Sequence, residues 1–227
     1  MKKILIIATL ATLLLFSCNN NKKAQDTNTD PTEQTQSAKD TIAEIKLAPS
    51  KALLFDPATL SEEPMFQINT NLGTIIISLY KDTPKHRDNF VKLASERFFD
   101  SVLFHRVING FMIQTGDPLT KNKANEAMFG SGGPGYNIPA EILPQFTHKK
   151  GALAAARMPD ISNPKRESSG SQFYLVQNEE ACKQLDGDYT IFGETLDGLE
   201  VIDRIARIPT KNERPIKDIY ILSILPL

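Results

Sequence analysis

The sequence is poor in the residues that many enzymes use for redox, metal or acid–base chemistry. Its 227 residues include only two cysteines and three histidines. His86 and His148 lack the spacing of metal ligands, and His105 has no partner nearby in the sequence. We therefore expect no metal site, and we interpret His105 as a structural residue.

Net charge is also low. The formal net charge is −1, and removal of residues 1–17 with their two lysines would make it −3. The basic residues are scattered along the chain, which argues against a nucleic-acid partner. Apart from Ile4–Phe16 the sequence has no long apolar run, so we expect no transmembrane helix.

The N-terminus has the pattern of an export signal. Two lysines precede the apolar run Ile4–Phe16, which is short for a membrane span and suits the core of a signal peptide. The following Ser17-Cys18 resembles the lipobox of bacterial lipoproteins, in which the cysteine is lipidated and becomes the first residue. The alternative is an ordinary secretory signal with an incidental cysteine. We expect lipidation at Cys18, which leaves Cys182 unpaired as a small packing residue rather than a reactive thiol.

Composition divides the chain into three parts. Residues 1–17 are the expected signal peptide, and 18–63 are expected to form a lipid-anchored flexible tether, because residues 19–47 contain almost no large apolar side chain. Leu53–Phe55 is an apolar cluster that either packs on the domain or forms a short helical turn. The folded domain is expected at 64–227.

Durable anchoring by acyl chains would place the domain in the bacterial cell envelope. Asn19 follows the lipidated cysteine and favours the periplasmic side of the outer membrane.

The domain begins with a pattern that predicts a β-hairpin and a helix. Alternation over 66–70 and β-branched residues over 74–80 flank Asn71-Leu72-Gly73, which predicts a hairpin with a three-residue loop. Thr83 and Pro84 mark a helix start, and apolar residues then recur at helical spacing for about 13 residues.

The rest of the domain predicts mainly strands. Residues 170–176, 190–195 and 216–224 are expected as strands, and 199–205 as a second helix capped by Asp197. Residues 151–156 are small and apolar and fit either a strand or a helix. Many short strands and two separated helices favour a closed or nearly closed antiparallel barrel, because closure removes free edges. The glycine-rich run 130–135 lacks the context of a phosphate loop, so we interpret it as a long turn.

The stretch from Phe104 to Asp117 combines a fixed cation, an amide and large apolar side chains. It lacks a nucleophile with a base, a proton shuttle or a metal cluster, so its chemistry should be conformational or electrostatic. This stretch resembles the signature of cyclophilin-type peptidyl-prolyl cis-trans isomerases. Gly170–Tyr174 and Leu185–Gly187 with Phe192-Gly193 resemble two further motifs of that family, in the same order, and the resemblance covers about 64–227.

The resemblance implies a fold, an activity and a site. The fold is mainly β, a closed eight-stranded antiparallel β-barrel capped by two α-helices. The activity is rotation about X-Pro bonds, which assists protein folding, and with the export signal the clients would be exported, proline-containing polypeptides. The enzyme is expected to act as a monomer, without a cofactor or a metal. The implied catalytic residues are Arg106 and Gln114. The implied substrate-binding residues are Phe111, Met112, Ala156, Gln172, Tyr174, Leu185 and Tyr189.

Several positions depart from the family pattern. Tyr174 stands where many members have Phe, Arg157 where many have Asn, and Tyr189 where some have His. Gln184 replaces a Trp that many members use to bind cyclosporin. The loop Met158–Ser168 is longer than in compact members and is expected beside the groove. The alternative function is a binding module or chaperone that recognises proline segments with little turnover.

Overall fold

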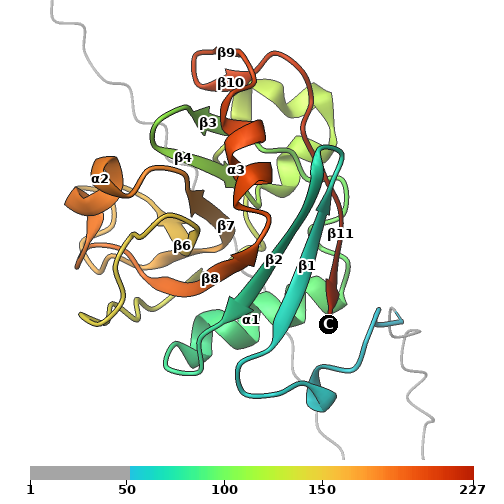
Figure 1. Ribbon diagram of the computed structural model, residues 1–227, viewed down its shortest axis with the longest axis vertical. Coiled ribbons are helices and arrows are strands. Elements are labelled where there is room, and N and C mark those ends of the chain that lie inside the picture. Colours follow the sequence, from blue (N-terminus) through green and yellow to red (C-terminus); the bar gives the residue numbers. More distant parts are fainter. Residues whose placement is uncertain (1–51) are drawn as a thin grey trace, which may run out of the picture. The chain divides into compact units, whose positions relative to one another are not determined.

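The computed structural model describes residues 52–227 (Figure 1). The expected signal peptide, the lipidation of Cys18 and most of the expected tether lie outside the described residues. Between residues 52 and 227, no helix combines the length and the hydropathy that crossing a bilayer requires.

The described chain is built mainly of strands. The strands are β1 (Met65–Thr70), β2 (Gly73–Leu79), β3 (Arg106–Ile108), β4 (Met112–Thr115), β5 (Asn137–Ile138), β6 (Ala152–Arg157), β7 (Ser168–Val176), β8 (Ile191–Asp197), β9 (Thr210–Lys211), β10 (Arg214–Pro215) and β11 (Ile221–Pro226). The α-helices are α1 (Pro84–Ser95), α2 (Glu179–Cys182) and α3 (Leu199–Ala206). Short 3₁₀ helices are η1 (Pro57–Thr59), η2 (Pro118–Lys121), η3 (Lys123–Met128) and η4 (Lys183–Leu185).

One curled antiparallel sheet forms the body of the domain. Its main path runs β11-β1-β2-β8-β6-β7-β4-β3, and β5 pairs with β7. Helices α1 and α3 lie toward opposite ends of this sheet (Figure 1). The small-residue segment whose structure the sequence left open is strand β6, which pairs with β7 and β8.

Closure of the barrel by a strand ladder is not seen, which corrects the expected closed barrel. The two outer strands of the path, β3 and β11, are not paired with each other. An isolated bridge, Leu103–Tyr220, and a bond from the Phe104 amide to the Ile219 carbonyl (2.8 Å) join the segments that precede them. These two contacts join the segments just before β3 and β11, but the strands themselves form no ladder with each other.

The predicted hairpin is confirmed. Strands β1 and β2 pair from Met65–Ser78 to Thr70–Gly73, so the connection has two residues between the last pair rather than the expected three. Hydrophobic side chains alternate into the core on both strands, because successive side chains of a strand point to opposite faces.

Both predicted helices form, with capping contacts that the sequence did not indicate. Thr83 is the N-cap residue of α1, as predicted, but its side chain makes no cap bond. Instead Glu141, from a distant loop, accepts hydrogen bonds from the amides of Lys85 (3.1 Å) and His86 (3.0 Å), so a carboxylate satisfies the free donors of the first turn. The N-cap of α3 is Gly198 with φ 89°, not Asp197.

Two apolar clusters fill the domain. The larger one packs phenylalanine and isoleucine side chains of the sheet against α1 and α3. The smaller one contains Met112, Ala154, Tyr174 and Cys182, all buried, under the end of the sheet formed by β4, β6 and β7. This second cluster forms the support of the site described below.

The folded domain begins earlier than the expected boundary at Pro64. The amide of Leu54 donates to the Ser95 carbonyl at the end of α1 (2.8 Å). The ring of Phe55 lies 5.8 Å from that of Phe66, and Leu60 packs on the same core. Residues 52–63 therefore belong to the domain, because burying these side chains offsets the entropy of ordering the segment.

We expect Phe55→Ala to lower the free energy of unfolding by about 1–3 kcal/mol, because a partly buried aromatic side chain is lost. Leu53→Ala is the matched control, since Leu53 is 51% exposed. Urea denaturation of both variants measures the difference. Equal stability of the two variants would show that the segment adds nothing to the fold.

Candidate functional site

A cavity of about 270 Å³ opens at the end of the sheet where β3, β4, β6 and β7 meet. The register of the sheet puts Arg106 opposite Gln114, and Gln114 opposite Tyr174. Directly paired residues project to the same face, so a cation, an amide and an aromatic ring form one row. The cavity is lined by Arg106, Phe111, Met112, Gln114, Ala156, Arg157, Tyr174, Leu185 and Tyr189.

Apolar side chains make up most of the cavity wall. Met112 is 1% exposed and Tyr174 4% exposed, so both are held rigidly by the cluster beneath them. Phe111 and Leu185 pack on the same cluster from the rim. The cavity therefore suits a small apolar ring, with two guanidinium groups, those of Arg106 and Arg157, and the amide of Gln114 among its lining groups.

A chain of amide hydrogen bonds orients Gln114. Its Nε2 donates to Oε1 of Gln172 (3.0 Å) and lies 3.4 Å from Nε2 of His105. The Nε2 of Gln172 in turn donates to the carbonyls of Gly130 (3.0 Å) and Gly132 (2.7 Å). Both amide nitrogens are thus engaged within the protein, which leaves the Gln114 carbonyl oxygen, an acceptor, without a hydrogen bond to a described residue.

The glycine-rich run supports this chain through its backbone. Asp117 accepts hydrogen bonds from the amides of Leu119 (2.8 Å) and Gly130 (2.5 Å). A Cβ at Gly132 would lie 2.1 Å from Oδ1 of Asp117, so the backbone can pass this carboxylate only as glycine. The run acts as a shaped turn, as expected, and its carbonyls hold Gln172.

The hydroxyl of Tyr174 contacts the buried His148, which in turn contacts the partly exposed Asp186. The Tyr174 hydroxyl lies 2.8 Å from Nε2 of His148, whose Nδ1 lies 2.6 Å from a carboxylate oxygen of Asp186. Burial lowers the pKa of His148 and raises that of Tyr174 well above its usual value. The neutral ring therefore donates from Nδ1 to Asp186 and accepts from Tyr174, which fixes the aromatic wall.

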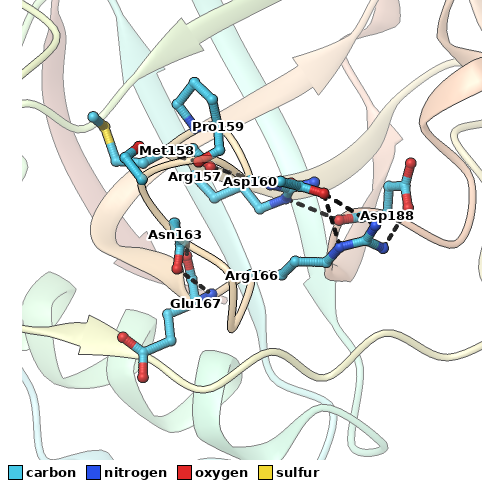
Figure 2. A network of polar contacts seen from close by, with 9 residues as sticks. Arg157, Met158, Pro159, Asp160, Asn163, Arg166, Glu167 and Asp188 are labelled. Atoms are coloured by element: carbon cyan, nitrogen blue, oxygen red, sulfur yellow. Dashed lines mark hydrogen bonds and ion pairs between the residues drawn. The ribbon is translucent and has the colours of Figure 1, made fainter.

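Arg157 connects the cavity to the long loop that follows β6. Its guanidinium lies over the ring of Tyr189 (4.4 Å), donates from Nε to the Asp188 carbonyl (3.0 Å) and forms an ion pair with Asp160. Arg166 pairs with Asp160 (3.1 Å) and with the Asp188 carboxylate (2.6 Å). Figure 2 shows these four charged residues as one network, and hydrogen bonding from Arg157 lowers the pKa of Asp160.

A second groove of about 390 Å³ adjoins the cavity on the side of this loop. Gln114, Ala156 and Arg157 line both spaces, so the two are adjacent. The far wall of the groove is formed by the glycine-rich run, Met158 and Glu167. A polypeptide bound in the cavity would therefore extend along this loop.

The structure brings eight of the nine predicted catalytic and substrate-binding residues to the cavity, and Cys18 lies outside the described residues. Gln172 does not line the cavity; it borders the second groove, and its amide is used to orient Gln114. His105 is buried, as expected for a structural residue, but it also contacts Gln114. Cys182 is buried beneath Phe111, and burial raises the pKa of its thiol to about 12, which confirms a packing residue.

Two sets of supporting residues were not predicted. His148 and Asp186 were separated by 38 residues in the sequence, and the only signal was the unusual tyrosine at 174. Arg106 donates from Nε to the carboxylate of Glu213 (2.6 Å), which lies 107 residues away on the turn between β9 and β10. Within residues 52–227, no group of His, Cys, Asp or Glu could hold a metal ion.

Comparison with known proteins identifies relatives of the whole domain. Residues 65–225 match the family model "Cyclophilin type peptidyl-prolyl cis-trans isomerase/CLD". Peptidyl-prolyl cis-trans isomerase B of Streptomyces anulatus is 36% identical over 186 residues, covering 73% of this chain and 98% of that protein. Peptidyl-prolyl cis-trans isomerase-like 3 of Gallus gallus is 33% identical over 160 residues, covering 69% and 92%.

Solved structures give the same result. A cyclophilin type peptidyl-prolyl cis-trans isomerase of Cryptosporidium parvum superposes with a TM-score of 0.64 at 30% identity, covering 73% of this chain and 98% of that one. A second crystal structure of that protein was determined in the presence of the dipeptide Ala-Pro.

The buried histidines predict loss of stability in mild acid. Burial lowers the pKa of all three, and that of His105 to about 4. Below about pH 6.5 the unfolded chain therefore binds protons that the folded chain does not, so stability is complete above this pH and falls toward pH 4. For His105 alone the loss approaches about 3 kcal/mol at pH 4.

Urea denaturation at pH 7.5, 6.5 and 5.5 measures this dependence, in a range where most carboxylates stay ionised. His105→Gln should make the profile shallower, because glutamine does not titrate. A free energy of unfolding that is constant from pH 7.5 to 5.5 would contradict the burial of neutral histidines.

Proposed function

The chain belongs to the family of cyclophilin-type peptidyl-prolyl cis-trans isomerases, and on this premise we propose how its cavity accelerates rotation about X-Pro bonds and where the protein acts. As a member of this family the chain is an isomerase, and cyclophilins bind proline-containing peptides as substrates. The observation that carries the mechanism is the row of Arg106, Gln114 and Tyr174 along one face of three paired strands.

The barrier to the reaction is the loss of amide resonance. An X-Pro bond rotates in tens to hundreds of seconds at 25 °C, because the planar amide has partial double-bond character. In the twisted transition state the prolyl nitrogen becomes pyramidal and regains a lone pair. A planar amide nitrogen accepts hydrogen bonds poorly, whereas a pyramidal one accepts them well. A donor aimed at this nitrogen therefore stabilises the transition state more than the ground state.

Arg106 is the donor in this proposal. Its guanidinium is planar, always protonated and borders the cavity that would hold the proline ring. Its Nε is engaged by Glu213, and the N–H groups of the two terminal nitrogens are the ones available to substrate. One charged hydrogen bond of about 1.5–3 kcal/mol supplies roughly 10–100-fold acceleration.

The cavity supplies the remainder by holding both sides of the rotating bond. Phe111, Met112 and Tyr174 would grip the proline ring away from water, where a charged donor is more effective. The carbonyl oxygen of Gln114, directed by the chain of amides, would accept a hydrogen bond from the substrate backbone. With the ring and one backbone group held, the bond between them is free to turn. This mechanism requires no proton transfer, metal or covalent intermediate.

We expect Arg106→Ala to lower kcat/KM about 10–100-fold and to leave the affinity for a proline peptide largely unchanged. A protease-coupled assay of an X-Pro peptide with residues 52–227 measures turnover, and calorimetry measures binding. Arg106→Lys keeps the charge but lacks the planar fork, so its kcat/KM should lie between those of the unchanged protein and Arg106→Ala. Equal loss of binding and turnover would contradict the role of Arg106. Absence of turnover in the unchanged protein would favour the alternative, a binding module or chaperone for proline segments.

We further propose that the protein is exported and held at a membrane by lipid on Cys18, and that it assists folding of envelope proteins. The basis is the sequence alone: a positive start, an apolar run and the Ser17-Cys18 pair. Slow X-Pro rotation limits the folding of exported chains, so an isomerase kept near the membrane would meet its clients as they emerge.

We expect Cys18→Ala to release the protein into the soluble fraction of the cell envelope, because the acyl chains that would hold it are lost. Fractionation and immunoblotting measure its distribution. Cys182→Ala is the matched control and should leave the distribution unchanged, since Cys182 is buried in the domain. Membrane association that survives Cys18→Ala would count against lipidation.

A further inference from the structure

The guanidinium of Arg106 has a single polar partner in the part of the chain that the structure describes. Its Nε donates to Oε2 of Glu213 at 2.6 Å, and both side chains are about half exposed. The ion pair occupies the Nε edge of the planar group. The terminal nitrogens carry four of the five N–H donors and make no hydrogen bond to a described residue, and Arg106 lines the cavity.

Glu213 occupies a backbone position that is unfavourable for glutamate. Strands β9 and β10 are joined by the two residues Asn212 and Glu213, with φ values of 51° and 63°. Two-residue hairpin loops with both φ values positive strongly prefer Asn-Gly, because only glycine adopts the second position without a steric cost at Cβ. Asn212 follows this preference, and Glu213 departs from it.

The same residue is attached firmly to the strand that carries Arg106. The carbonyl of Glu213 accepts a hydrogen bond from the amide of Val107 at 2.7 Å. Val107 is the neighbour of Arg106 in β3, so the backbone of Glu213 is held in a fixed place relative to the guanidinium. A strained non-glycine residue that the surrounding structure holds in place is typical of functional sites.

We propose that Glu213 is a positioning residue for the isomerase reaction: it holds the Nε edge of Arg106 so that the terminal nitrogens face the prolyl nitrogen. The inference rests on the donor role proposed for Arg106. A free arginine has many rotamers, and restricting them before substrate binds removes an ordering cost from the transition state. The strained turn is then the structural cost of placing a carboxylate where glycine would fit better.

Glu213→Gly separates this role from a structural one, because the two predict opposite changes. Glycine removes the carboxylate and relieves the positive φ, so the melting temperature should stay the same or rise. The value of kcat should nevertheless fall about threefold to tenfold, with KM and peptide affinity unchanged. Glu213→Gln, which keeps an acceptor but loses the charge, should retain part of the lost turnover.

Asn212→Gly is the matched control. It relieves the other positive φ of the same turn and does not touch the ion pair, so it should leave kcat unchanged. Asp218→Asn is a second control, because its ion pair with Lys123 (2.9 Å) is also exposed and neither residue lines the cavity.

Three results would overturn the inference. These are full turnover in Glu213→Gly, a rise in kcat, and a fall in kcat that Asn212→Gly reproduces. The Arg106→Ala variant, measured in parallel, distinguishes the two proposals. If Arg106→Ala keeps full turnover, the donor role of Arg106 fails; if it is inactive while Glu213→Gly is normal, only the positioning role fails. In the double variant, loss of Glu213 should add nothing to the loss of Arg106.

Discussion

The antiparallel pairing of β4 with β3 on one side and with β7 on the other is the constraint on which the site depends. This ladder places Arg106, Gln114 and Tyr174 side by side, although 68 positions separate the first from the last in the numbering. A slip of one residue in either pairing would turn the row away from the cavity, because the side-chain period of a strand is two. The buried side chains of Met112 and Ile113 resist such a slip, since it would exchange the faces they occupy.

In the proposed mechanism the site acts by holding groups in place rather than by transferring protons. Burial keeps His105 and His148 neutral, so neither acts as an acid at neutral pH, and both instead engage neighbouring side chains. The hydrogen-bonded amides from the glycine-rich run to Gln114 serve the same purpose. Preorganised donors and acceptors cost no reorganisation at the moment of reaction, which is why a bond rotation can be accelerated without a reactive group.

A network of charged residues lies beside the cavity and includes Arg157, one of the lining residues. Asp160 joins Arg157 to Arg166, and Asp188 closes the network on the far side of the loop (Figure 2). Isolated exposed ion pairs contribute little to stability, but several charges that share partners define a geometry. Here the shared partners hold Arg157, which lines both the cavity and the second groove.

The sequence by itself determined the family, the hairpin, both main helices and eight of the nine residues that line the cavity, because motifs and side-chain periodicity are local properties. It could not determine what holds those residues in place. Glu141 caps α1, Asp186 orients Tyr174 through His148, and Glu213 pairs with Arg106, all across long separations in the chain. The order of the strands and the path of the loops decide these contacts, so only the tertiary structure contains them. For the same reason the lack of pairing between β3 and β11 and the start of the domain before Pro64 became known only from the tertiary structure.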